Sequence, residues 1–466
     1  MLFSNLFFVL LFLPVFLIAY HFVAALSGKN VKRENTALLI FSLFFYAFGG
    51  LKGLIVLLVV TVIAYIGGRM MIHAEESARK VPLILTVSLL VLILAFFKYA
   101  GFFISISMPI GLSFYIFQLL SYVADVYTGK IEEEISFKNL LIYTACFHHV
   151  LQGPILRYND IGEALRKRNY NSTTLSNGIF RFCTGLFKKV LLADHAGELA
   201  NSLLPNAADI SSVPTLSVWL GSICFSLQMF IDFSSYSDMA IGLGEMIGFK
   251  YPENFDYPYI SKSIREFWRR WHISLSFFFR DYVYIPLGGN RKGKGRKILN
   301  LLIVWLLTGI WHGSTVNFIV WGLFYFVFLC IEDLWREHVK FDLPAVIKHI
   351  YVIFVFNLGW LIFRFENTSY LLTALKTFFG MGENGFTMQT VTLMAKNNVF
   401  FFIVAILVCT PVFKKITDTL DQRAKERKVK KRTVSFVKML ISVVALILSI
   451  IIMAGSSYQP FLYNQF

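Results

Sequence analysis

Long apolar stretches separated by short polar connections recur along the whole chain. A helix needs about 20 mostly apolar residues to cross a bilayer. The pattern therefore predicts an all-α polytopic membrane protein. Eleven candidate membrane segments can be marked: Phe3–Leu26, Thr36–Gly49, Ile55–Ile66, Val81–Phe97, Met108–Val123, Val213–Ile231, Ile298–Trp311, Asn317–Cys330, Ile350–Phe363, Val399–Phe413 and Phe436–Ala454.

Three further segments are apolar but short or interrupted by charge. Leu140–Leu151 is short, Ile179–Ala193 contains three basic residues, and Ile264–Leu287 carries several charges. Such segments are too polar to face lipid, so we expect them to be interfacial, re-entrant or enclosed by other helices. The pattern thus predicts an internal chamber.

The polar connections are too short to form a soluble domain. The longest, Tyr158–Thr174 and Lys414–Arg432, have under about 20 residues, which is the length of loops. The sequence shows no internal repeat and no matching pair of segments broken by Gly or Pro, and this disfavours the repeat architecture of many secondary transporters. We therefore predict a single membrane domain over residues 1–466.

The composition agrees with a membrane protein. Hydrophobic residues make up 56% of the chain and charged residues only 15%, and the mean hydropathy is +0.63, far from the balance of a soluble domain. The first segment lacks the basic start and small-residue cleavage site of a secretion signal, so we expect it to be retained. The five cysteines show no CxxC spacing, which indicates neither a disulfide framework nor a zinc site, and we predict no metal ligands.

The formal net charge of +16 does not indicate nucleic acid binding, because the basic residues gather in short connections between segments, as the positive-inside rule describes. Placing these clusters in the cytoplasm puts both termini outside and makes the number of spans even. The clusters are Lys29, Lys32 and Arg33; Arg69, Arg79 and Lys80; Arg291 to Lys297; and Lys414 to Arg432.

One histidine lies in the apolar and aromatic stretch "LLTGIWHGSTVNFIVWG". His312 is either a packed histidine bonded to a neighbouring carbonyl or a functional group, since ionisable side chains are costly at membrane depth. On a continuous helix, Thr308, Trp311, His312 and Thr315 would share one side. A neutral imidazole, with an ordinary pKa of about 6.5, can accept a proton from an alcohol. This arrangement suits acyl transfer, and Gly309 and Gly313 would let another chain or a ligand approach closely.

A second histidine lies in the charged segment "SIREFWRRWHISLSFFFRDY". Helical spacing would align Trp268, His272, Leu275 and Phe279 on one face. The arginines around His272 either hold lipid headgroups on an interfacial helix or bind the phosphates of an activated acyl donor, to which guanidinium groups are suited. Both interpretations are open at this point.

Other polar residues give weaker signals. Asp232 and Asp238, in a run rich in Ser and Tyr, either line a polar passage or are buried against basic partners. His148 and His149 are adjacent, so on a helix they would point about 100° apart and form a poor chelating pair.

Several motifs together resemble the membrane-bound O-acyltransferase (MBOAT) superfamily, and within it the bacterial alginate O-acetyltransferase branch. The resemblance runs from the first segment to the last residues, and its central block is long. The matching stretches are "PIGLSFYIFQLLSYVADVY" (Pro109–Tyr127), "GPILRY" (Gly153–Tyr158), "GLFKKVLLAD" (Gly185–Asp194), the block from Asp232 to Arg291, "TGIWHG" (Thr308–Gly313), "GWLIFR" (Gly359–Arg364) and "PFLYNQF" (Pro460–Phe466).

The resemblance implies a ring of transmembrane helices around a funnel or tunnel, with re-entrant and interfacial helices. By motif, His312 corresponds to the catalytic histidine and His272 to a second polar position, which is asparagine in many eukaryotic relatives. We therefore expect His312 to act as general base and His272 to orient substrate. Further residues expected at the substrate site are Trp268, Arg269, Arg270, Trp271, Trp311, Thr308, Asp232 and Ser235.

The implied reaction moves an acetyl group from a cytoplasmic thioester across the bacterial inner membrane for O-acetylation of an extracellular or cell-wall polysaccharide. Acetyl-CoA is the expected donor, without a tightly bound cofactor. The receiver is either a partner protein of the SGNH-hydrolase-like type or the glycan itself. Transfer through a covalent acyl-histidine is a further alternative.

One stretch departs from the family pattern, since "CFHHVLQGP" from Cys146 replaces the expected apolar, proline-containing lead into "GPILRY". Three rival functions are also open, one of which is a non-catalytic scaffold for a polysaccharide export complex. A D-alanyl transferase of teichoic acid modification would use a carrier-protein thioester, and a transporter or flippase of glycan precursors would use His272 and His312 to relay protons.

Overall fold

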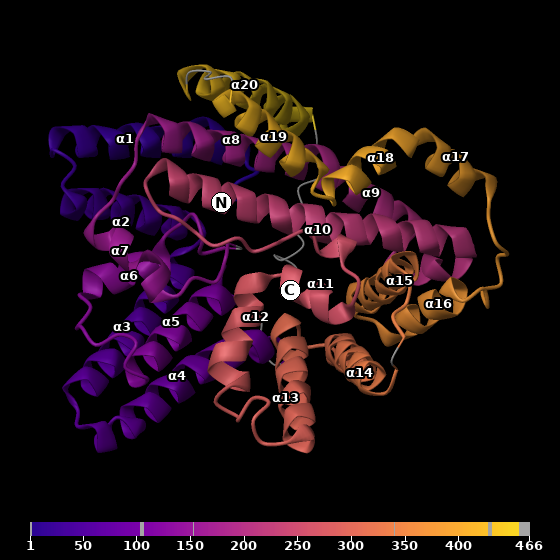
Figure 1. Ribbon diagram of the computed structural model, residues 1–466, viewed down its shortest axis with the longest axis horizontal. Coiled ribbons are helices and arrows are strands. Elements are labelled where there is room, and N and C mark those ends of the chain that lie inside the picture. Colours follow the sequence, from indigo (N-terminus) through magenta and orange to yellow (C-terminus); the bar gives the residue numbers. More distant parts are fainter. Residues whose placement is uncertain (1, 103–106, 152, 340, 427–430, 456–466) are drawn as a thin grey trace. The chain divides into compact units, whose positions relative to one another are not determined.

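The computed structural model describes residues 2–102, 107–151, 153–339, 341–426 and 431–455. All regular elements in these residues are helices (Figure 1). The prediction of an all-α protein is thereby confirmed. The motif "PFLYNQF" lies outside the described residues.

The described residues form two compact units. The first contains Met1–Leu186, Tyr236–Glu253 and a segment that starts at Ser435, and the second contains Phe187–Ser235 and Asn254–Val434. The long helix α10 (Thr215–Met246) contributes its first part to the second unit and its last part to the first. The single domain stays a prediction.

The first unit is built on closely packed helices. A side chain at Gly67 of α3 would overlap Thr86 of α4, and one at Gly68 would overlap the Tyr122 hydroxyl of α5. Glycine at these two positions therefore lets α4 and α5 lie directly against α3 (Figure 1). The helices of this unit are η1 (Phe8–Phe12), α1 (Leu13–Leu26), α2 (Val31–Phe48), α3 (Leu51–His73), α4 (Lys80–Tyr99), α5 (Leu112–Tyr127), α6 (Phe137–Ala145), α7 (Tyr158–Arg166), α8 (Ser172–Lys188) and α20 (Lys431–Gly455).

The second unit is organised around a hairpin of α13 (Lys294–His312) and α14 (Val316–His338), against which α15 (Ala345–Arg364) packs (Figure 1). A side chain at Gly309 would lie 2.5 Å from the carbonyl oxygen of Phe318. A side chain at Gly322 would overlap the carbonyl oxygen of Trp305. The close approach expected at Gly309 is therefore made by α14. The other helices are η4 (Lys189–Ala193), α9 (Asp194–Leu203), α11 (Ile264–Arg270), α12 (Ile273–Phe279), η7 (Arg280–Tyr284), α16 (Thr368–Phe378), α17 (Gln389–Asn397), α18 (Val399–Val408) and α19 (Val412–Glu426).

Seven described helices are long and apolar enough to cross a membrane, or eight if the bent pair α17 and α18 counts as one span. The protein is thus a multi-pass membrane protein, as predicted. The seven are Phe8–Leu26, Leu51–His73, Glu76–Tyr99, Thr215–Met246, Val316–His338, Ala345–Arg364 and Thr433–Gly455.

Four of the eleven predicted segments differ from this set. The helices α2 and α13 both begin with charged residues in their first turns, and α5 has only 16 residues, most of them buried. The segment Val399–Phe413 is not one straight span, because α18 ends at Val408 and meets α17 at an angle of 58°. Apolar composition alone does not distinguish a helix buried in protein from one that faces lipid.

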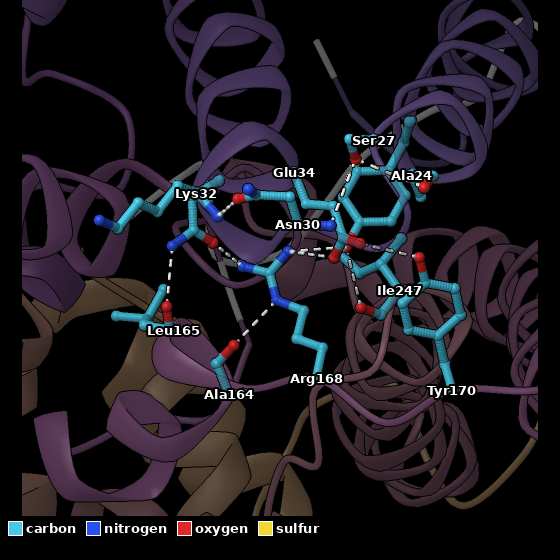
Figure 2. A network of polar contacts seen from close by, with 12 residues as sticks. Ala24, Ser27, Asn30, Lys32, Glu34, Ala164, Leu165, Arg168, Tyr170 and Ile247 are labelled. Atoms are coloured by element: carbon cyan, nitrogen blue, oxygen red, sulfur yellow. Dashed lines mark hydrogen bonds and ion pairs between the residues drawn. The ribbon is translucent and has the colours of Figure 1, made fainter.

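A buried arginine ties together three parts of the first unit (Figure 2). The Arg168 side chain is fully buried and donates to Tyr20 Oη at 2.6 Å, to Ala164 O at 3.0 Å and to Asn35 Oδ1. The Glu34 carboxylate lies 3.8 Å away and accepts a hydrogen bond from Tyr20 Oη at 3.0 Å. The network connects α1, α2 and the segment after α7, so its loss should loosen this end of the unit.

Replacing Arg168 by Met should lower the free energy of unfolding by about 3–5 kcal/mol, because the Glu34 carboxylate would keep its buried position without its cation. Thermal unfolding of the purified protein in detergent measures this effect. The double variant Arg168→Met, Glu34→Gln should recover part of the loss.

The matched control is Arg166→Gln, which removes an exposed ion pair with Glu133 whose atoms lie 2.5 Å apart. It should cost about 0–1 kcal/mol. Equal losses in Arg166→Gln and Arg168→Met would contradict the structural role assigned to the buried network.

Candidate active site

His312 is the last residue of α13. The chain turns directly after it. Gly313 is extended, and a side chain at this position would overlap the Phe318 ring. Thr315 is the N-cap residue of α14, so the expected alignment of Thr315 with His312 on one helix is wrong. Thr308 and Trp311 do lie on the same helix as His312.

Aromatic rings surround the His312 imidazole. Its centroid lies 4.6 Å from the Trp311 ring, 4.8 Å from the Trp321 ring and 5.1 Å from the Phe363 ring. Only 6% of His312 is exposed.

His272 lies at a sharp break between α11 and α12. Its backbone is left-handed, with φ 42° and ψ 56°, which a residue other than glycine rarely adopts. The expected continuous helix that aligned Trp268, His272, Leu275 and Phe279 is therefore wrong. Instead, the His272 ring packs 4.8 Å from Phe233 and 6.2 Å from Trp311. Trp311 thus contacts both candidate histidines.

Asn254 fixes the His272 ring, and sequence reasoning did not single it out. Its buried side-chain oxygen accepts from the Ser274 amide at 3.2 Å and from Ser274 Oγ at 2.8 Å, and it lies 3.2 Å from His272 Nδ1. A backbone amide only donates, so the atom facing it is the oxygen, and His272 Nδ1 must carry the proton. No sequence pattern marked this residue, which lies in the loop stretch "PENFDYP" directly before the charged segment.

Burial lowers the pKa of His272 to about 3. This residue lies outside the membrane-spanning helices. The ring is therefore neutral near pH 7, and with its proton on Nδ1 its other nitrogen, Nε2, is an acceptor. An imidazole of this kind is suited to receiving a hydrogen bond from a substrate group.

A cavity of about 360 Å³ in the second unit brings four predicted site residues together. They are Trp268, Arg269, His272 and Thr308. Three other basic residues, Arg265, Arg280 and Lys297, also line it, and each is paired with an aspartate. The cavity therefore combines an apolar wall, a neutral imidazole and several positive charges.

Three other predicted residues are positioned differently. Arg270 pairs with Asp256 at 2.9 Å and with Glu266 at 2.9 Å. Trp271 is buried, with its ring 4.8 Å from that of Trp360. Ser235 is fully buried on α10. These three residues are not among those that line the cavity of the described unit, and their role in substrate binding stays a prediction.

Asp232 belongs to a buried charge cluster. Lys189, in the π-helical turn η4, has a side chain only 1% exposed, and its Nζ lies 2.9 Å from Asp232 and 2.5 Å from Asp194. We expected the segment Ile179–Ala193 to be interfacial, re-entrant or enclosed by other helices. The Lys189 side chain of this segment is enclosed. Asp232 is followed by Phe233, which packs on His272.

His148 and His149 lie in the first unit, both buried. His148 contacts Tyr251 Oη through Nδ1 at 2.7 Å and Cys146 Sγ through Nε2 at 2.8 Å. His149 Nδ1 accepts from Gln118 Nε2 at 3.1 Å. Burial lowers the pKa of both histidines. Within the described residues, no group of three or more His, Cys, Asp or Glu side chains is arranged to hold a metal ion.

The fold and these residues define a multi-pass helical membrane protein in which one neutral histidine, His272, lines a basic cavity and a second, His312, is enclosed by aromatic rings. The chain belongs to the MBOAT, membrane-bound O-acyltransferase family, whose model matches residues 41–409. It is therefore an O-acyltransferase. The resemblance drawn from the sequence motifs is confirmed.

Three relatives refine this result. "Probable alginate O-acetylase AlgI" of Pseudomonas syringae pv. tomato is 39% identical over 389 residues, which cover 79% of this chain and 73% of the relative. "Peptidoglycan O-acetyltransferase" of Helicobacter pylori is 31% identical over 465 residues, which cover 89% and 87%. "Teichoic acid D-alanyltransferase" of Bacillus subtilis is 30% identical over 240 residues, which cover 49% and 60%.

Replacing Asn254 by Asp should raise the pKa of His272 by about one to three pH units, because a carboxylate at this distance favours the imidazolium. When the solution is acidified, His272 of this variant would become protonated at a higher pH than in the unchanged protein. The acid limb of the pH profile of acyl transfer should move upward accordingly.

Ser274→Ala is the control, since it removes a donor to the same oxygen without adding charge. It should leave the acid limb where it is. An unchanged acid limb in Asn254→Asp would rule out the contact between Asn254 and His272 as a determinant of the protonation state.

Proposed function

We propose that the protein transfers an acetyl group from acetyl-CoA on the cytoplasmic side of the inner membrane to a polysaccharide hydroxyl outside, with both chain termini outside. The observation that carries this proposal is the basic cavity lined by His272 and Thr308. Thr308 lies one helical turn before His312 on α13. The family supplies the acyl transfer, and the relatives named for alginate and peptidoglycan O-acetylation support acetyl as the group and a glycan as the acceptor.

The donor end of the proposal rests on charge. A coenzyme thioester carries phosphates, and guanidinium groups bind phosphate oxygens with two parallel hydrogen bonds. Arg269 is exposed where it lines the cavity, whereas Arg265, Arg280 and Lys297 also pair with carboxylates. Arg269 is therefore the residue from which we expect the largest contribution to donor binding.

The chemical step uses two histidines in different roles. His312 accepts the proton of the attacking hydroxyl, and the hydroxyl oxygen forms a bond to the thioester carbonyl carbon. The carbon–sulfur bond then breaks, and His312 gives the proton to the leaving thiolate. His272, neutral and held by Asn254, positions a substrate group through Nε2. Low polarity around His312 strengthens each electrostatic contact made in the transition state.

The acceptor is proposed to be an extracellular or cell-wall polysaccharide, reached directly or through a secreted partner of the SGNH-hydrolase-like type. Transfer of D-alanine from a carrier-protein thioester is the rival within the family. The D-alanyltransferase match covers about half of this chain, whereas the acetyltransferase matches cover 79% and 89%. We therefore favour acetyl transfer.

His312→Ala should reduce acetylation of the cell-surface polymer by roughly 10²–10⁴-fold, which is the usual contribution of a general base. Acetate released from the polymer by alkali measures this loss, with membrane expression checked in parallel. His272→Ala should cause a partial loss. The control is His338→Ala, which changes an exposed histidine at the end of α14.

Normal acetylation in His312→Ala would remove this residue from the mechanism. A glycan transporter would instead show no acetyl transfer or hydrolysis dependent on His312 when membranes receive labelled acetyl-CoA. Labelled acetyl that stays attached to the protein through His312 would support the covalent route in place of direct attack.

Arg269→Gln should raise the KM for acetyl-CoA roughly five- to tenfold with a smaller change in kcat, because it removes one phosphate contact at an exposed position. Steady-state transfer by the purified protein measures both constants. Arg291→Gln, an exposed change that does not line the cavity, is the matched control. Binding to an acyl carrier protein but not to acetyl-CoA would instead favour the D-alanyl alternative.

A further inference from the structure

A second cavity in the same unit, of about 610 Å³, lies where two membrane-spanning helices end. The last turns of α14 and the first turns of α15 form its walls, and Lys262 and Ser263, directly before α11, complete it. Neither candidate histidine lines it. The proposed acyl transfer therefore leaves this cavity unexplained.

Its lining is divided into an apolar and a basic part. Ile331, Trp335 and Ile347 are each more than 40% exposed, and all three lie on membrane-spanning helices. The basic part consists of Lys262, Arg336 and Lys348. Tryptophan is enriched where membrane hydrocarbon meets water, so this cavity has the composition of a site at that boundary.

The acidic residues of the lining leave a net positive charge. Glu332 accepts hydrogen bonds from the backbone amides of Ile264 and Arg265, so its carboxylate faces the start of α11. Asp342 is 88% exposed and pairs with Lys348 at 2.5 Å. An exposed pair of this kind contributes little stability, and a stronger anion can replace the Asp342 carboxylate.

We propose that this cavity binds one anionic phospholipid. Its phosphate is held by Lys262, Arg336 and Lys348, and its acyl chains lie along the exposed apolar faces of α14 and α15. A single molecule with a charged head and two hydrocarbon chains matches both parts of the lining. A free phosphate would leave the apolar faces uncovered, and an acidic peptide would have no hydrocarbon to place beside them.

Such a lipid would bear on the element that leads to His272. Ser263 caps α11 by accepting a hydrogen bond from the Glu266 amide at 3.0 Å. Glu332 of α14 accepts hydrogen bonds from the Ile264 and Arg265 amides in the first turn of the same helix. Ser263 and Glu332 both line the cavity. The bound phospholipid therefore stabilises the junction of α11 with α14 and α15.

Native mass spectrometry of the full-length protein in detergent tests the proposal without any acyl donor. We expect phosphatidylglycerol to be retained more tightly than phosphatidylcholine. The double variant Lys262→Gln, Lys348→Gln should weaken phosphatidylglycerol binding by about fivefold for each charge removed. Asp342→Asn should strengthen it, because the competing carboxylate is gone.

The matched control, Arg291→Gln with Lys292→Gln, removes two exposed charges that do not line the cavity. It should leave binding unchanged. Equal retention of the two lipids, equal weakening in the control, or displacement of phosphatidylglycerol by millimolar inorganic phosphate would overturn the proposal. Because lipid binding is the readout, these outcomes are independent of whether acetyl transfer is the reaction.

Discussion

The structure depends on one constraint of the protein interior, which is that buried polar groups must find hydrogen-bonding or charged partners within the protein. Arg168 does so with Glu34 and Tyr20, and Lys189 does so with Asp194 and Asp232. His272 does so with the side-chain oxygen of Asn254. Arg168 and Lys189 each link segments that are distant in sequence, and Asn254 holds the break between α11 and α12, so satisfying a polar group also fixes the local packing.

The two candidate histidines have different surroundings. His272 is held by hydrogen bonding, since Asn254 accepts from its Nδ1 and from Ser274. The His312 ring packs against the rings of Trp311, Trp321 and Phe363. The contact with Asn254 defines the tautomer of the His272 ring. The three aromatic rings define the surroundings of the His312 ring. The different roles assigned to the two residues follow from this difference.

Sequence reasoning captured what depends on composition and missed what depends on single backbone angles. Apolar length predicted most spans, and the motifs predicted the family and the cavity residues Trp268 and Thr308. The left-handed backbone of His272 and the turn at Gly313 broke two helices that were expected to continue, because periodicity continues across a break of one or two residues. Asn254 was missed since an amide in a loop has no pattern, and only its neighbours in space reveal its use.

The contact between α13 and α14 has a mechanical consequence. With no side chains at Gly309 and Gly322, the two backbones meet directly, and neither helix can slide or rotate without a collision. The hairpin therefore resists sliding of one helix against the other, which favours a fixed position for the imidazole at its tip. Delivery of the reactants must then rely on displacements elsewhere, in elements whose contacts are made by side chains that can change rotamer.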